Sequence, residues 1–496
     1  MLTEIAITAF DSFQWLALIF FVGLNGGYIL LNIATFFTLP PYVRRSVLSD
    51  LPQPCNGYEP PVSLILTAYN EEAVIVSSVR SLLQIEYPEY EIIVVNDGST
   101  DNTLELLRRE FDLVDFPATF RPRVKHAPVR AIYQSRTYPE LRVVDKQNGG
   151  RKSDASNAGI NAARFPLVCP LDADSVVERD AIRRLAQPFV EDPHMVATGG
   201  IVRILNGCEV SGGFIKNVRL PRHPLALVQI VEYLRAFLFG RIGWSAVDAL
   251  PLISGAFGLF HKETLIELGG YRHDTLAEDM ELVLRLHSHF RLSGKPYRVA
   301  FVPDPVCWTE APEDLRTLRN QRIRWHRGLL ECMVIHRRLL FNPKARLLGF
   351  LTMPFLLIFE GLGPIVEVLG YAVMFMGFAL GLLSPSGFFA FMAVALGLGI
   401  TLTLTSLLLE EMSYDTYPST RQVLALIAAA VLENFGYRQL TAIWRVRATL
   451  MWMRGADASW GRMARTASWN DSPRSIEASA RETIGPEAPA VTRLAS

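Results

Sequence analysis

Two kinds of hydrophobic pattern alternate along this chain. Residues 14–37, 347–383 and 386–409 are almost continuously apolar, and about 20 such residues can span a bilayer as a helix. Residues 62–163 instead show short apolar runs separated by segments with helical spacing of apolar positions. The pattern therefore predicts an α/β domain that lies between membrane helices.

The alternating segment predicts a mainly parallel sheet. Strands that are joined through helices usually run parallel and are linked by crossovers. In such sheets ligands bind outside the carboxyl ends of the strands. The expected strands are 62–67, 91–95, 141–144 and 165–170, and the expected helices are 71–84, 101–110 and 152–164.

The first apolar run predicts one transmembrane helix over residues 13–39, after an N-terminal segment 1–12. No basic stretch precedes it and no small-residue cleavage site is clear, which argues against a signal peptide. Arg44 and Arg45 follow the run, and the positive-inside rule then predicts a cytoplasmic domain. Residues 40–61, with several prolines toward their end, predict a linker.

The second half predicts further membrane elements over residues 347–445. The run 347–383 is too long for one plain span and contains charged residues and Pro364, so it fits either an interfacial helix plus a span or two short spans. The run 386–409 predicts one span. Residues 423–445 are apolar but interrupted by polar side chains, which suits a helix on the membrane surface.

A further apolar segment, residues 225–242, predicts an amphipathic helix near the membrane surface, and residues 252–258 predict a strand with two glycines. Residues 316–336 predict a basic helix. The tail 446–496 is expected to be cytoplasmic and, from about residue 470, disordered because it is rich in Pro, Ala, Ser and charge.

The composition agrees with a membrane protein. Half of the residues are hydrophobic and the mean hydropathy is +0.21. Basic and acidic residues balance at 49 each, so the charge gives no sign of a nucleic acid partner and none is expected. The five cysteines are widely spaced without a C-x-x-C pair, which predicts reduced thiols and neither a disulfide framework nor a zinc site.

Acidic and polar side chains follow the predicted strands. Asp172 and Asp174 come directly after the run 165–170 with one residue between them, and alternate side chains of an extended backbone share a face. Both can therefore bind one hard cation such as Mg²⁺ or Mn²⁺, whose open positions substrate phosphates would fill. A plain polar turn would explain the pair alone equally well. Tyr69 and Asp97 also follow strands, so one common site is expected.

The order of several motifs resembles that of the membrane-integrated family 2 glycosyltransferases, which include cellulose, chitin, hyaluronan and poly-N-acetylglucosamine synthases. The resemblance covers about residues 62–327 and the flanking membrane helices. It departs at Ala277, where the family usually has a threonine. The motifs are Thr67-Ala-Tyr69-Asn70-Glu71, Val95-Asn-Asp97-Gly98-Ser99, Asn148-Gly-Gly150-Arg-Lys152, Asp172-Ala-Asp174, Ala277-Glu278-Asp279 and Gln321-Arg-Ile-Arg324-Trp325.

The resemblance implies a GT-A-like glycosyltransferase domain over residues 62–335, which uses a UDP-sugar (UDP-glucose or UDP-N-acetylglucosamine) and Mg²⁺ or Mn²⁺. It implies that Asp279 takes the proton of the acceptor hydroxyl, that Glu278 orients it, and that a metal on Asp174 and Asp172 offsets the charge of the leaving UDP. The residues expected to bind the nucleotide sugar are Thr67, Tyr69, Glu71, Asp97, Lys152 and Asp172.

The same resemblance implies an acceptor site on the helix 316–336. Gln321, Arg324 and Trp325 stand at i, i+3 and i+4, and such positions share a helix face. Ser254 and Gly255 are weaker acceptor candidates. Without the resemblance, Trp325 could equally anchor its helix at the membrane interface, and Glu278 and Asp279 could be acids that favour a helix start.

Three functions compete. A processive synthase would extend a β-linked polysaccharide and export it, and a non-processive transferase would glycosylate a membrane lipid. An inactive scaffold predicts losses among the carboxylates, and none is lost. The helices after the catalytic segment and the intact Q-x-x-R-W motif favour the synthase. The expected partners are the UDP-sugar, the growing glycan or lipid acceptor, membrane lipids and a separate regulatory or export subunit.

Overall fold

The computed structural model describes residues 2–49, 58–117, 121–211, 213–414 and 416–455. The twelve strands of the described residues are β1 (Val62–Ala68), β2 (Tyr90–Asn96), β3 (Leu113–Asp115), β4 (Val129–Ser135), β5 (Leu141–Lys146), β6 (Leu167–Asp172), β7 (Val176–Val177), β8 (Met195–Ile204), β9 (Glu209–Ser211), β10 (Phe214–Asn217), β11 (Gly258–His261) and β12 (Arg298–Thr309).

The helices fall into two groups. Those between residues 75 and 345 are α2 (Ile75–Leu82), α3 (Thr103–Glu110), α4 (Lys152–Ala162), α5 (Ala181–Glu191), α6 (Pro224–Tyr233), η1 (Leu234–Phe239), α7 (Gly240–Ala246), α8 (Lys262–Glu267), α9 (Glu278–Ser293), α10 (Leu315–Ile335), η2 (Arg337–Leu339) and η3 (Pro343–Ala345). The others are α1 (Leu2–Ser49), η4 (Leu348–Thr352), α11 (Met353–Phe355), η5 (Leu356–Gly361), α12 (Gly363–Ala379), α13 (Pro385–Ser413), α14 (Thr420–Leu432), η6 (Glu433–Tyr437) and α15 (Arg438–Met453).

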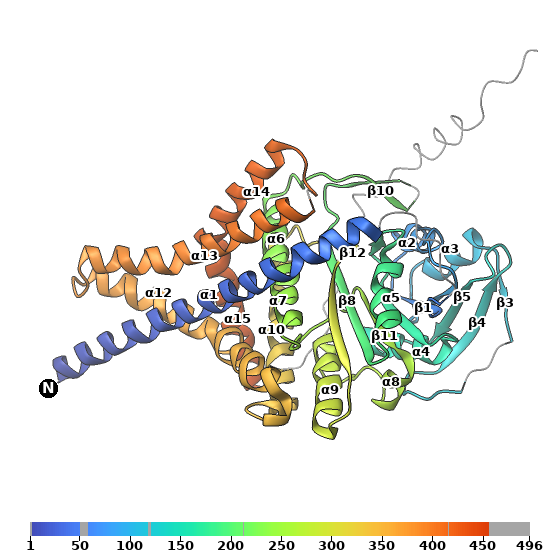
Figure 1. Cartoon of the computed structure of the whole chain (residues 1–496), viewed down its shortest axis with the longest axis horizontal. Helices are drawn as coiled ribbons and strands as arrows, with labels where there is room; N and C mark the ends of the chain where they lie inside the picture. The colour runs from blue at the N-terminus through green and yellow to red at the C-terminus, as the bar shows by residue number, and fades with distance from the viewer. Residues whose placement is uncertain (1, 50–57, 118–120, 212, 415, 456–496) are drawn as a thin grey trace, which may run out of the picture.

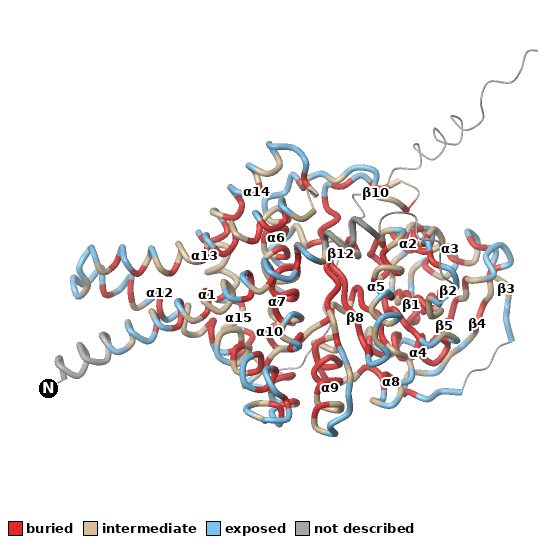
Figure 2. The backbone as a smooth tube through the Cα atoms, in the orientation of Figure 1, coloured by how far each residue is buried: buried red, intermediate tan, exposed pale blue. Residues whose placement is uncertain are grey.

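Ten strands form one mixed sheet in the order β3-β4-β5-β2-β1-β6-β11-β8-β12-β7. Its longest ladders are parallel, β1 with β2 and with β6, and β8 with β12. The centre of the sheet is buried on both faces (Figure 2), as the continuous apolar runs require. The predicted α/β fold with a mainly parallel sheet is confirmed, while β3 and β4 add an antiparallel edge that the sequence did not predict.

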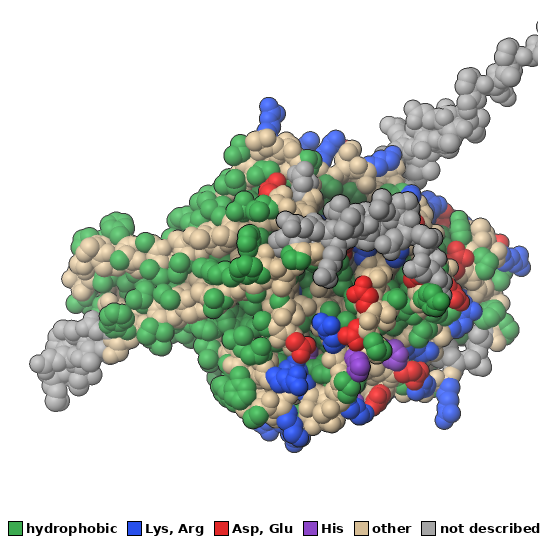
Figure 3. Space-filling view, in the orientation of Figure 1, with side chains coloured by type: hydrophobic (Ala, Val, Ile, Leu, Met, Phe, Trp, Pro, Cys, Tyr) green, Lys and Arg blue, Asp and Glu red, His purple; other side chains and the backbone are tan. Residues whose placement is uncertain are grey.

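Long helices extend from one side of this domain (Figure 1). Their surface is mostly hydrophobic, whereas charged side chains gather over the sheet domain (Figure 3). Two described helices are long and apolar enough to cross a membrane, with spans at Ser12–Leu39 and Pro385–Ser413. The segments Leu348–Gly361 and Gly363–Ala379 together pass the same test but are bent by 42°, so the long run 347–383 is a broken helix pair.

Several boundaries differ from the expectation. The first helix continues to Ser49, so the expected linker is helical over its first part, and residues 50–57 lie outside the described residues. Helix α15 continues to Met453, past the expected start of the tail at residue 446. The expected disorder from about residue 470 falls wholly outside the described part of the chain.

The segment 225–242 is packed within the protein, and its expected place near the membrane surface stays a prediction. It forms α6, η1 and α7, in which Gln229, Leu238 and Phe239 are almost fully buried. The segment 423–445 is also not a single surface helix, because it breaks at η6, where Glu433 is fully buried and pairs with an arginine of η1. A polar residue inside an apolar run can thus mark an internal ion pair as well as an exposed face.

Four of the five cysteines lie within the described residues. Cys169, Cys208, Cys307 and Cys332 are buried free thiols. Cys55 lies outside the described residues. Burial raises the pKa of the Cys208 thiol, so this group is unreactive as expected of a packed side chain.

Candidate active site

The ends of β1 and β2 are joined by hydrogen bonds between their loops. Asn70 adopts a left-handed conformation with φ of 57°, which asparagine tolerates better than most residues. Its side-chain Oδ1 accepts a hydrogen bond from the Thr100 amide at 2.8 Å, and its own amide donates to Ser99 Oγ at 3.0 Å. This turn presents Tyr69, which is 43% exposed, and Glu71 at the carboxyl edge of the sheet.

Asp97 follows β2 and is held by a buried lysine. The ammonium of Lys146, at the end of β5, pairs with Asp97 and lies 2.5 Å from Oδ2 of Asp154. Asp97 also accepts a hydrogen bond from the Gly149 amide at 3.1 Å. Burial raises the pKa of Asp97, and Lys146 acts against this rise. Lys146 itself is fully buried, so it holds Asp97 from the interior of the domain. The solvent side of the loop stays open to a ligand.

Lys152 stands in the first turn of α4 and links two parts of the site. Its Nζ atom lies 2.5 Å from Oδ1 of Asp172, at the end of β6, and donates to the carbonyl oxygen of Gly255 at 2.7 Å. Thr67 lies beside Asp172 in the parallel register of β1 and β6. A cation at a helix start beside a partly exposed carboxylate is suited to meet a phosphate group.

Asp174 is almost fully buried in the turn that follows β6, so the extended backbone expected to carry both Asp172 and Asp174 ends at Asp172. Its Oδ2 accepts a hydrogen bond from the hydroxyl of Thr309 at 3.3 Å. Within the described residues no group of three or more His, Cys, Asp or Glu side chains is arranged to hold a metal ion. The two carboxylates Asp172 and Asp174 still fit a cation of the Mg²⁺ type, because such ions are often held by one or two carboxylates and complete their coordination with substrate phosphates and water.

Asp279 is joined to Lys152 through the backbone of Gly255. The amide of Gly255 donates to Oδ2 of Asp279 at 3.1 Å, and the carbonyl of the same residue accepts from Lys152. The expected strand at 252–258 is instead a loop, and only Gly258 begins a strand, β11. This loop turns the backbone of Gly255 toward Asp279, and a Cβ atom there would lie 3.5 Å from the Asp279 side chain.

Glu278 lies beside Asp279 at the start of α9. Burial, and then the negative charge of Asp279, raise the pKa of Glu278 to about 7, while Lys152 and Arg324 lower it. A carboxyl group with this pKa can hold or release a proton near neutral pH. The four named groups therefore form one electrostatic cluster at the carboxyl edge of the sheet.

Helix α10 binds the loop that leads into α9 through hydrogen bonds and close packing. Glu331 Oε2 accepts hydrogen bonds from the Leu276 amide at 2.8 Å and the Thr275 hydroxyl at 3.1 Å. Gly328 packs so tightly on Ala277 that a Cβ atom added to Gly328 would lie 2.5 Å from the Ala277 Cβ. This close approach gives a physical reason for alanine at position 277, since a larger side chain there would meet the helix.

The predicted acceptor residues Arg324 and Trp325 of α10 have different direct neighbours. Arg324, Gly328 and Glu331 share one face at i, i+4 and i+7, and Arg324 acts electrostatically on Glu278. Trp325 is the next residue on the helix, and Phe237 of η1 meets its ring edge-on at 5.7 Å between centroids. Arg241, on which Asp279 acts electrostatically, lies over the same Phe237 ring. The expectation that Gln321, Arg324 and Trp325 reach one place stays a prediction.

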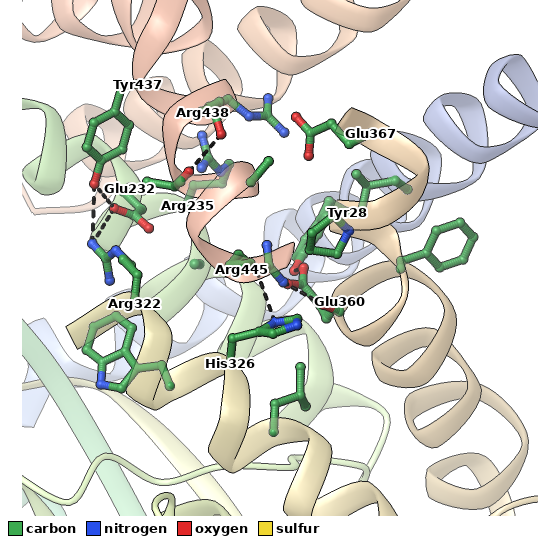
Figure 4. A pocket seen from close by; sticks show the side chains of 18 of the residues that line it. Tyr28, Glu232, Arg235, Arg322, His326, Glu360, Glu367, Tyr437, Arg438 and Arg445 are labelled. Atoms are coloured by element: carbon green, nitrogen blue, oxygen red, sulfur yellow. Dashed lines mark hydrogen bonds and ion pairs between the residues drawn. The ribbon is translucent and has the colours of Figure 1, made fainter. Parts of the chain in front are cut away.

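Trp325 lines a cavity of about 250 Å³ between the catalytic segment and the membrane helices (Figure 4). Ionic side chains from different elements surround it and are largely paired with one another: Glu360 with Arg445 at 2.6 Å, and Glu232 with Arg322 at 2.7 Å. The other polar lining residues are Tyr28, Arg235, His326, Glu367, Tyr437, Arg438 and Thr441. Ionisable side chains that line a cavity beside candidate membrane helices often mark a substrate pathway.

Comparison with known proteins identifies the family. The model described as "Glycosyl transferase family 2" matches residues 63–212, and the model described as "Glycosyl transferase family group 2" matches residues 167–407. Together they span more than half of the chain. The protein belongs to the family 2 glycosyltransferases. The predicted family of membrane glycosyltransferase enzymes is thereby confirmed.

Two curated relatives are poly-beta-1,6-N-acetyl-D-glucosamine synthases. The one from Staphylococcus epidermidis is 30% identical over 295 residues, 59% of this chain and 59% of the relative. The one from Staphylococcus aureus (strain COL) is 32% identical over 269 residues, 54% of each. The chain thus matches somewhat more than half the length of these relatives. Among solved structures, a mannosyltransferase from Pyrobaculum calidifontis, solved with GDP-Man and Mn²⁺, is 20% identical with a TM-score of 0.46 and covers 88% of this chain and all of that one.

The sequence did not predict two buried cations that lie next to the candidate site residues. Lys146 and Arg241 are nearly buried cations near Asp97 and Asp279, respectively. Burial lowers the pKa of Arg241 to about 10, and Asp279 acts against this shift. In the sequence both look like ordinary charged residues. A charge next to apolar neighbours in a predicted strand or buried helix is the one signal that could have marked them.

Proposed function

We propose that the protein is an inverting, metal-dependent transferase that uses a UDP-sugar to extend a β-linked polysaccharide at the membrane. The observation that carries the proposal is the continuous contact from Asp172 through Lys152 and Gly255 to Asp279. It joins the expected metal and diphosphate end of the site to the expected base. The names of the curated relatives favour N-acetylglucosamine over glucose as the sugar.

In this mechanism Asp279 accepts the proton of the acceptor hydroxyl while that oxygen attacks the anomeric carbon. The bond from this carbon to the diphosphate oxygen breaks, and UDP leaves with the electron pair, so one displacement inverts the configuration. Lys152 meets the negative charge that gathers on the diphosphate. A divalent cation on Asp172 and Asp174 would add Lewis-acid stabilisation of the same charge.

The cavity beside Trp325 supports the polysaccharide as product. It lies between α10 and the helices α1, α12 and α15, so a chain that has been extended at Asp279 could continue past Trp325 toward the bilayer. The catalytic domain would face the cytoplasm, where nucleotide sugars are made, and the product would leave through the helices. Membrane lipids and a separate regulatory or export subunit are further expected partners.

The proposal is tested with the purified full-length protein in detergent. It is incubated with UDP-N-acetylglucosamine, UDP-glucose or GDP-mannose, with Mg²⁺ or Mn²⁺, and the products are sized. We expect a polymer from UDP-N-acetylglucosamine, and its loss with excess chelator or in Asp174→Asn. Asp112→Asn is the matched control, since Asp112 is exposed and has a φ of 46° that asparagine accepts.

Each other outcome contradicts part of the proposal. A product that carries a single sugar on lipid would favour the non-processive transferase. Full activity in excess chelator would refute the metal dependence. If the wild-type protein turned over none of the three donors, the proposed reaction itself would be wrong.

A further inference from the structure

Arg322 lies in the Q-x-x-R-W segment at a position to which the resemblance assigns no role. Its Nη2 atom donates to Oε2 of Glu232 at 2.7 Å and to the hydroxyl oxygen of Tyr437 at 3.3 Å. The Tyr437 hydroxyl in turn donates to the same Glu232 oxygen at 2.7 Å. The three side chains come from α10, α6 and η6 and close a triangle at one end of the cavity (Figure 4).

Arg322 connects this triangle to Trp325, the proposed acceptor tryptophan. The guanidinium carbon of Arg322 lies 4.4 Å from the centre of the Trp325 ring, and Phe237 meets that ring from another element. A cation over an indole face is attracted by the negative electrostatic potential that the ring quadrupole creates there. The orientation of Trp325 therefore depends on where Arg322 is held, and Arg322 is held by Glu232 and Tyr437.

Tyr437 is presented by a break in the helix. Gly436 has φ of 103° and Phe435 is also non-helical, so the chain changes direction immediately before Tyr437. Upstream of the break, Glu433 is fully buried and pairs with Arg235. Burial, and then the charge of Glu232, raise the pKa of Tyr437, so its hydroxyl remains a donor at neutral pH.

We propose that Tyr437 and Glu232 are positioning residues that fix, through Arg322, the orientation of the Trp325 face that receives the acceptor sugar. This inference rests on the proposed function, because it takes Trp325 as the acceptor platform. It adds that residues after Ser413, where the last candidate span ends, contribute to the acceptor site. A change at Tyr437 should therefore alter acceptor binding without altering nucleotide-sugar binding.

The test uses Tyr437→Phe in the full-length protein, with a β-linked N-acetylglucosamine tetrasaccharide as acceptor probe. We expect the acceptor Kd, measured by calorimetry, to rise about tenfold, since hydrogen bonds to charged groups are the strong ones. The UDP Kd should stay at the wild-type value. Glu232→Gln should act in the same direction. Tyr414→Phe is the matched control, because it removes another enclosed hydroxyl, which donates to the Pro303 carbonyl.

A second variant separates a positioning role from a merely structural one. In a Trp325→Phe background, Tyr437→Phe should weaken tetrasaccharide binding less than it does in the wild type, because coupled residues are not additive. Equal effects in the two backgrounds, or a Tyr437→Phe protein that binds the tetrasaccharide as the wild type does, would overturn the inference. Absence of any glycosyl transfer by the wild type would instead contradict the proposed function.

Discussion

The Nζ atom of Lys152 lies 2.5 Å from Oδ1 of Asp172, and the same atom donates to the carbonyl of Gly255. The ammonium therefore neutralises an expected metal ligand while it contacts the loop that binds Asp279. A nucleotide sugar that arrives with a divalent cation brings a second partner for each of these two groups. Lys152 would then turn to the diphosphate and leave Asp172 to the cation.

This exchange predicts opposite effects of Lys152→Gln on two ligands. UDP should bind about tenfold more weakly, because a charge-assisted contact to phosphate is lost. Mn²⁺ alone should bind more tightly than to the wild type, because Asp172 no longer has a competing cation. UDP calorimetry and Mn²⁺ titration by electron paramagnetic resonance measure the two effects, with Lys125→Gln on an exposed loop as control.

Mn²⁺ binding that weakens in Lys152→Gln would mean that Lys152 supports the metal and does not compete with it. UDP binding equal to that of the wild type would remove the lysine from the diphosphate site. Either result would leave the family assignment intact, because that depends on the whole pattern of motifs.

The candidate-site residues at strand ends could be predicted, because the hydrophobic period of a strand and the position of its end are local properties of the sequence. Asp97 and Asp172 each follow an apolar run, and parallel strands bring their carboxyl ends to one edge. The loop at Gly255 could not be predicted, because residues 252–258 have the composition of a strand. Its turn becomes favourable only through contacts with Lys152 and Asp279, which are distant in sequence.

The arrangement around α10 shows the same limit. The sequence correctly predicted the helix but not the partners of its side chains, since spacing shows that Gln321, Arg324 and Trp325 can share a stripe and not what each one meets. The structure packs this helix between the α9 start and the cavity, so adjacent residues of the motif serve different partners. Buried cations such as Lys146 likewise depend on partners from other strands and loops.

Glu278 predicts a dependence of stability on pH. Its pKa is raised from 4.5 to about 7 in the folded protein, so between these values the folded state binds more protons than the unfolded state. The stabilising contribution is complete below about 4.5 and is lost as the pH rises through about 7. The thermal unfolding midpoint of the wild type should therefore fall over this range, and Glu278→Gln should reduce the fall.

The matched control for this titration is Glu105→Gln, whose carboxylate is largely exposed on α3. Its midpoint should follow the wild-type profile across the same pH range. If Glu278→Gln kept the full wild-type slope, the protonated carboxyl would not contribute to folding and another group would have to account for the dependence.

Gly328→Ala should disturb catalysis from outside the site. The added Cβ atom would lie 2.5 Å from Ala277 Cβ and 2.8 Å from the Ala277 amide nitrogen, so α10 must move away from the loop before Glu278. We expect a loss of about 1–3 kcal/mol in unfolding free energy, as for other overpacked positions, and a fall in the transfer rate with UDP binding unchanged. Gly397→Ala is the control, because nothing lies within 4 Å of its Cβ position.

A Gly328→Ala protein with the wild-type transfer rate would show that the contact between α10 and the Ala277 loop is not needed to align Asp279. The double variant Ala277→Gly, Gly328→Ala offers a second check, since it removes the side chain that the new methyl group meets. Partial recovery of the rate is expected there, because the backbone nitrogen still lies close.

The different neighbours of Arg324 and Trp325 predict different effects of their substitution. Arg324 acts on Glu278, so Arg324→Ala should lower the transfer rate for every acceptor length. Trp325 lines the cavity, and an indole face binds sugar rings without close discrimination, which suits an acceptor renewed after each addition. Trp325→Ala should therefore shorten or abolish the polymer and weaken tetrasaccharide binding by roughly tenfold, while UDP binds as it does to the wild type.

Product sizing together with UDP calorimetry distinguishes these two effects. Trp15→Ala serves as control, since Trp15 is 66% exposed on α1 and should leave product length unchanged. A uniform fall in rate for Trp325→Ala with normal polymer length would mean that the tryptophan acts on the transfer step and not on the growing chain. A product of one sugar on lipid, made equally well by the wild type and by Trp325→Ala, would show that the cavity does not hold a growing chain, and processive synthesis would be wrong.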